Sequence, residues 1–168
     1  MAKLYGKVGA KTRGYYIEAE MVDDNTITGK LGGKLEGHDL EIKISSETTE
    51  LSGRFGREEL EKDLKLCLNK ENEDDLFLNY DVIGRISGYS NQSDVSIEGS
   101  EKEGFTGRIG DNEGYNVNLK ANKERNLVTG RLGGKIKGAS VEVNLEEFPV
   151  VIGVLIIALT YKLYLELA

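Results

Sequence analysis

One short motif recurs six times along the chain and constrains its fold more than any other feature. In each copy a glycine is followed by a cation and then by a bulky apolar residue, and the shared glycines are Gly6, Gly29, Gly53, Gly84, Gly107 and Gly130. By subtraction, successive glycines are separated by 23, 24, 31, 23 and 23 residues. Only the third interval is longer, and an acidic insertion, NKENEDD at 69–75, accounts for it. A fixed period of this kind predicts an architecture built from one repeated supersecondary unit.

The second half of each unit alternates strictly between apolar and polar residues, as in LEIKI at 40–44 and VEVNL at 141–145. Period two is typical of strands with one buried face. Turn-forming segments such as EGHD, DNEG and TRG separate the two halves of the units. Each unit is therefore predicted to be a β-hairpin, and six hairpins give twelve antiparallel strands in one domain. The expected hairpins occupy residues 4–26, 27–50, 51–81, 82–104, 105–127 and 128–147.

The repeat glycines share strand parity with bulky apolar residues, so they are predicted to point inward. In the second unit Gly29 lies on the same face as Ile27 and Leu31, whereas Lys30 lies on the opposite face. Glycine inside a strand marks a bend or a close approach by another element. Six glycines at one level therefore indicate a central element that all six hairpins approach.

The C-terminal segment supplies that central element. From Pro149 to Leu167 the chain is apolar nearly all round, and such a helix has to be surrounded by protein or by lipid. The uninterrupted apolar run, 148–161, has the length of a buried core helix more than that of a membrane span. Twelve strands also enclose more space than side chains alone fill. We therefore expect a mainly β fold, a closed twelve-stranded antiparallel barrel around a hydrophobic central helix at 149–167.

Composition narrows the classes of function. The chain has 168 residues, a size typical of one domain, and its net charge of −7 argues against nucleic-acid binding through phosphate neutralisation. The single cysteine excludes an internal disulfide and indicates a reducing compartment. Residues 1–14 lack the apolar stretch of a signal peptide. We expect a cytoplasmic monomer that is at most peripheral to a membrane.

The strand count, the strand order and the tail FPVVIGVLIIAL at 148–159 together resemble the tubby C-terminal-like superfamily over the whole chain. That superfamily includes tubby domains, LURP-one-related proteins and phospholipid scramblases, in which twelve antiparallel strands close around a hydrophobic C-terminal helix. The resemblance implies a non-catalytic binding or scaffold module with peripheral contact to anionic phospholipids. It also implies an alternative, a membrane-anchored scramblase-like protein with its C-terminal helix in the bilayer.

One set of charged residues is a candidate site. The cation after each repeat glycine is predicted to face outward, and these cations form a belt: Lys7, Lys30, Arg54, Arg85, Arg108 and Arg131. As a functional site, this cation belt would bind anionic phospholipid headgroups or a protein partner. As a structural feature, it would form a lattice of cross-strand ion pairs, and the net charge of −7 favours the lattice. The candidate carboxylates for that lattice are Glu18, Glu20, Glu41, Glu98 and Glu142.

The sequence lacks catalytic and metal-binding patterns. His38 lies in the turn EGHD and is expected to be exposed, without the partnered nucleophile or carboxylate of a catalytic histidine. Parity turns Cys67 outward, and the segment 69–75 lacks the spacing of a calcium loop. Phe77 and Ile83 are predicted to form a small exposed apolar surface beside that segment. We therefore expect no enzymatic activity, no metal and no cofactor.

Overall fold

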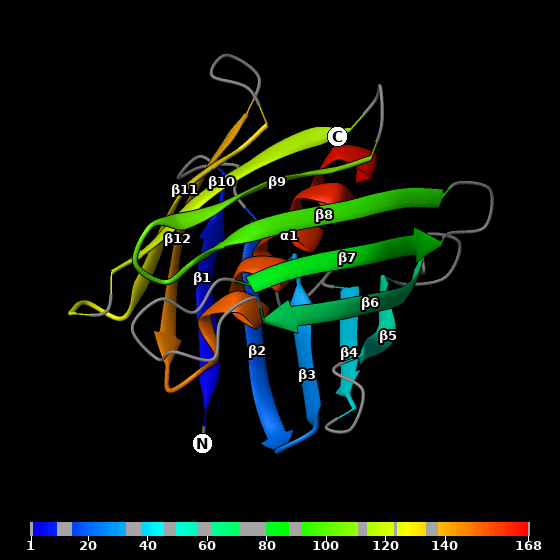
Figure 1. Cartoon of the computed structure of the whole chain (residues 1–168), viewed down its shortest axis with the longest axis horizontal. Helices are drawn as coiled ribbons and strands as arrows, with labels where there is room; N and C mark the ends of the chain where they lie inside the picture. The colour runs from blue at the N-terminus through cyan, green and yellow to red at the C-terminus, as the bar shows by residue number, and fades with distance from the viewer. Residues whose placement is uncertain are drawn as a thin grey trace.

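The computed structural model contains twelve β-strands and one α-helix in the part of the chain that it describes (Figure 1). The described residues are 2–9, 15–32, 38–45, 50–56, 62–70, 80–87, 92–110, 114–122, 124–133 and 138–167. The elements are β1 (Lys3–Val8), β2 (Tyr15–Asp23), β3 (Thr26–Leu31), β4 (His38–Ile44), β5 (Glu50–Gly56), β6 (Lys62–Lys70), β7 (Tyr80–Ser87), β8 (Gln92–Ser100), β9 (Gly104–Ile109), β10 (Tyr115–Asn122), β11 (Leu127–Leu132), β12 (Ala139–Glu146) and α1 (Val150–Leu167).

The sheet is a closed barrel in which every strand pairs antiparallel with its neighbours in sequence. Closure comes from β1 and β12, where Leu4 lies opposite Leu145 in register. Alternation decides which side chains fill the barrel: in β12, Val141, Val143 and Leu145 are buried, whereas Glu142 between them is exposed. The expected closed twelve-stranded antiparallel barrel of β-hairpins is thereby confirmed.

The helix α1 runs through the interior of the barrel (Figure 1). All residues from 151 to 161 are buried, and they form one hydrophobic core with the inward side chains of the strands. Its 18 residues give a length of roughly 27 Å. Glu147 has a φ of 57°, in the left-handed region, at the point where the chain passes from β12 towards α1. In the described part of the chain, no helix combines the length and the hydropathy that crossing a membrane requires.

Polar contacts hold the last turns of α1 against the barrel wall. The Tyr115 hydroxyl on β10 donates a hydrogen bond to the Ala158 carbonyl at 2.5 Å. The Tyr115 ring also packs edge-on against the Tyr161 ring, with centroids 4.7 Å apart. Lys162 Nζ donates to Ser93 Oγ on β8 at 2.9 Å. Because these contacts are directional, they fix the position of α1 along the barrel axis more precisely than apolar packing alone would.

The repeat glycines allow neighbouring strands to approach each other, and the expectation that they make room for the helix is wrong. A Cβ at any of the six would overlap a backbone carbonyl oxygen of the preceding strand in the barrel. The pairs are Gly6 with Glu142, Gly29 with Glu18, Gly53 with Glu41, Gly84 with Lys65, Gly107 with Ser96, and Gly130 with Asn118. Close approach of α1 is eased instead at Gly153, where a Cβ would lie 3.0 Å from Leu145 Cδ2.

Candidate functional site

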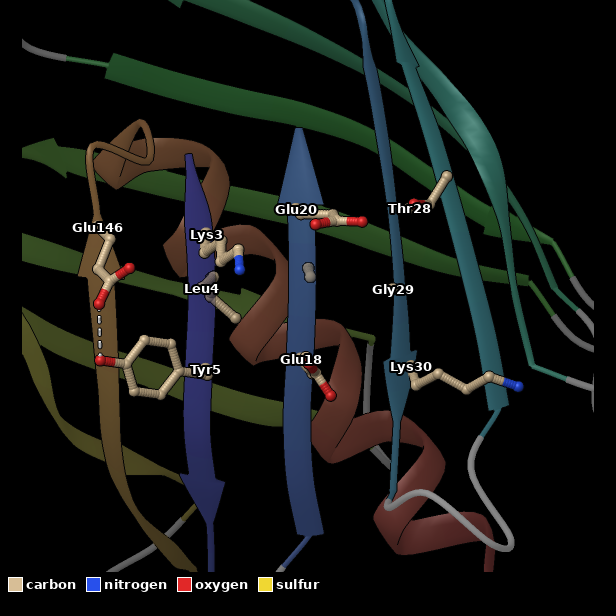
Figure 2. Close-up of a pocket in the computed structure, with 10 residues that line it drawn as sticks. Lys3, Leu4, Tyr5, Glu18, Glu20, Thr28, Gly29, Lys30 and Glu146 are labelled. Carbon is tan, nitrogen blue, oxygen red and sulfur yellow. Dashed lines mark hydrogen bonds between the residues drawn. The ribbon is translucent and has the colours of Figure 1, made fainter. Parts of the chain in front are cut away.

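The surface is hollowed into a groove of about 460 Å³ that crosses β12, β1, β2 and β3 (Figure 2). Its lining includes Leu4 and the small residues Ala19 and Gly29. The remaining lining residues are polar or ionisable: Lys3, Tyr5, Glu18, Glu20, Thr28, Lys30 and Glu146. Sequence reasoning missed this groove, because it depends on barrel closure bringing the last strand beside the first.

Two polar contacts order the groove. The Tyr5 hydroxyl donates a hydrogen bond to Glu146 Oε1 at 3.0 Å across the β1–β12 pair (Figure 2). This bond and the negative charge of Glu146 raise the pKa of Tyr5, because both favour the neutral phenol. On the other side of the groove, Lys30 Nζ lies 2.7 Å from Asp39 Oδ1 and points away from Glu18.

The cation belt lies on the outer surface, on β1, β3, β5, β7, β9 and β11. Four of its members are exposed, and Lys7 and Arg131 are half-buried. In every hairpin the belt cation stands directly opposite a polar or aromatic residue of the following strand in register: Lys7 opposite Tyr16, Lys30 opposite Asp39, Arg54 opposite Asp63, Arg85 opposite Asp94, Arg108 opposite Asn116 and Arg131 opposite Ser140. The strand register within each hairpin therefore determines which residue lies opposite each belt cation.

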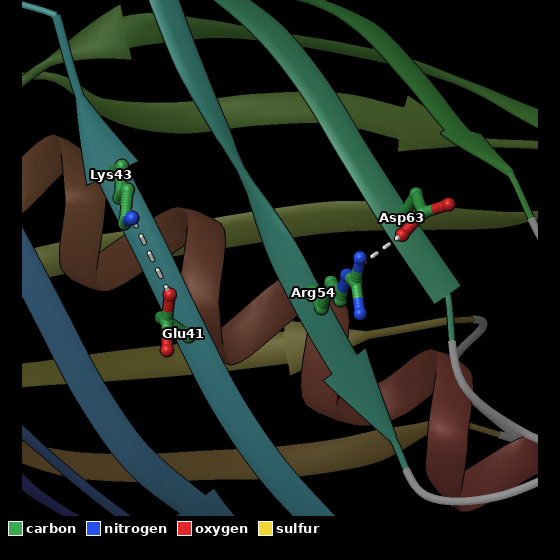
Figure 3. Close-up of polar contacts among 4 residues, drawn as sticks. All are labelled: Glu41, Lys43, Arg54 and Asp63. Carbon is green, nitrogen blue, oxygen red and sulfur yellow. Dashed lines mark ion pairs between the residues drawn. The ribbon is translucent and has the colours of Figure 1, made fainter.

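Three belt cations form ion pairs with those partners. The distances are 2.7 Å for Lys30–Asp39, 3.5 Å for Arg54–Asp63 and 3.1 Å for Arg85–Asp94. Figure 3 shows the Arg54–Asp63 pair and, on β4, a longer contact of 4.0 Å between Lys43 and Glu41. The carboxylates named from sequence were thus the wrong ones for these three cations. Exposed pairs of this kind contribute about 0–1 kcal/mol each, so they stabilise the barrel little.

Between described residues, the contacts of the other three belt cations include uncharged groups. Lys7 lies over the Tyr16 ring, 5.3 Å from its centroid. Arg108 Nη1 donates to Asn116 Oδ1 at 2.9 Å, and Arg131 Nη1 donates to Ser140 Oγ at 3.2 Å. These two arginines belong to three adjacent strands, β9, β10 and β11, that contain no aspartate or glutamate. We call the outer face of these strands the acid-free panel; its cations are Arg108, Lys120 and Arg131.

His38 is buried, with 5% of its surface exposed, and the expectation of an exposed turn residue is wrong. It is the first residue of β4 and shares parity with the buried residues Leu40 and Ile42. His38 pairs with Leu31 of β3, so the strand begins two residues before Leu40, where the predicted alternation starts. Parity was the signal that would have placed this histidine correctly.

The remaining candidates are settled only in part. Ile83 is exposed as predicted, at 49%, whereas Phe77 and most of the acidic segment 69–75 lie outside the described residues. Cys67 lies opposite Glu50 in the β5–β6 ladder, and its side chain is outside the described set. Among the described residues, no group of three or more histidine, cysteine, aspartate or glutamate side chains is placed to hold a metal ion.

Comparison with known proteins adds no relative to this description. No family model matches the chain. No match was found among curated proteins or among solved structures. The functional argument therefore rests on the groove, the cation belt and the acid-free panel.

Proposed function

We propose that this protein is a non-catalytic binding module whose acid-free panel contacts anionic phospholipid at a membrane surface. The observation that carries the proposal is the charge distribution on β9, β10 and β11, where Arg108, Lys120 and Arg131 are interspersed with uncharged polar side chains. A local excess of positive charge attracts an anionic surface even when the whole chain has a net charge of −7. Since α1 fills the barrel interior, its burial supports a function on the outer surface.

The expected affinity is low. Each basic residue close to an anionic membrane contributes about 1 kcal/mol, so three cations give at most about 3 kcal/mol. The hydrogen bonds from Arg108 to Asn116 and from Arg131 to Ser140 orient the guanidinium groups on the outer face of the panel. Screening over about 8 Å at physiological ionic strength weakens the attraction further. The proposal is thus a peripheral, salt-sensitive contact made by a cytoplasmic monomer.

The architecture also supports our proposal of kinship with the tubby C-terminal-like superfamily, since a closed twelve-stranded barrel surrounds a C-terminal helix. The membrane-anchored alternative requires α1 to leave the barrel. That movement would expose the apolar side chains that α1 and the strands bury against each other, at about 25 cal/mol for each Å². This cost favours the outer surface as the place of contact with phospholipid.

Liposome flotation tests the proposal. The wild-type protein should float with phosphatidylserine-containing vesicles at low salt and not with phosphatidylcholine vesicles. The variant Arg108→Gln with Arg131→Gln should lose this flotation. The matched control, Arg54→Gln with Arg85→Gln, removes the same net charge from cations that are ion-paired with Asp63 and Asp94, and it should still float. Absence of wild-type flotation at low salt, or equal loss in both variants, would overturn the proposal.

A further inference from the structure

We draw no further inference here: the strongest candidate, the groove that crosses β12, β1, β2 and β3 beside Lys3 and Lys30, carries none because nothing in the described part of the structure shows what covers it.

Discussion

Replacing a repeat glycine with alanine should destabilise the barrel, although the same change stabilises proteins wherever the backbone tolerates a Cβ. In Gly107→Ala the new Cβ would overlap the carbonyl oxygen of Ser96 and would lie 2.7 Å from Ile97 Cα. Both are backbone atoms of β8, so neither moves aside as the end of a flexible side chain does. The two strands have to separate at this level of the barrel, and the ladder between them is strained.

The sign and the size of the effect follow from two opposing contributions. Where the backbone accepts alanine, the change from glycine stabilises by about 0.4–1 kcal/mol through the unfolded chain. Overpacking of a well-packed site costs typically about 1–3 kcal/mol and outweighs that gain. For a domain of 168 residues, each kcal/mol shifts the melting temperature by about 2–4 °C. Subtracting the gain leaves a net loss of up to about 2.6 kcal/mol, so the melting temperature of Gly107→Ala should fall by up to roughly 10 °C.

Thermal unfolding followed by circular dichroism measures this shift, with Gly153→Ala as the control. In the control the new Cβ would lie 3.0 Å from Leu145 Cδ2 and 3.3 Å from Leu4 Cδ1, both at the ends of flexible side chains. Alanine also favours a helix interior by up to about 1 kcal/mol over glycine. The control should melt at the wild-type temperature or above it. If Gly107→Ala also melts there, the explanation through contact between strands is wrong.

Three further predictions concern the core and the groove. Deleting the residues after Glu147 should abolish cooperative unfolding because α1 fills the core, and a deletion that stays monomeric in gel filtration and unfolds cooperatively would contradict this. Tyr115→Phe should lower the free energy of unfolding by about 0.5–1.5 kcal/mol in denaturant titrations, since the hydrogen bond from the Tyr115 hydroxyl to the Ala158 carbonyl is lost. Spectrophotometric titration should show Tyr5 ionising above its ordinary pKa and returning towards it in Glu146→Gln. Because the pKa is raised, the stability from this bond is present below the unfolded-state pKa and is lost as pH rises through the folded-state value.

The barrel could be predicted from the sequence because alternation reports burial directly. Leu40 and Ile42 are buried and Glu41 between them is exposed, as period two requires. The hydrophobic tail was expected inside the barrel because twelve strands enclose more space than side chains fill, although an apolar helix can also be surrounded by lipid. The start of the helix differs from the prediction by one residue, Val150 in place of Pro149.

Interactions that depend on register were not predictable in this way. Parity indicates the side of the sheet on which Gly29 lies, but the atom that a Cβ would meet, the Glu18 carbonyl oxygen, depends on how β2 and β3 are aligned. The alignment of β3 with β4 likewise pairs Lys30 with Asp39, where composition alone favoured glutamates of neighbouring strands. For His38, turn composition was given more weight than parity, and the strand begins earlier than the turn suggested.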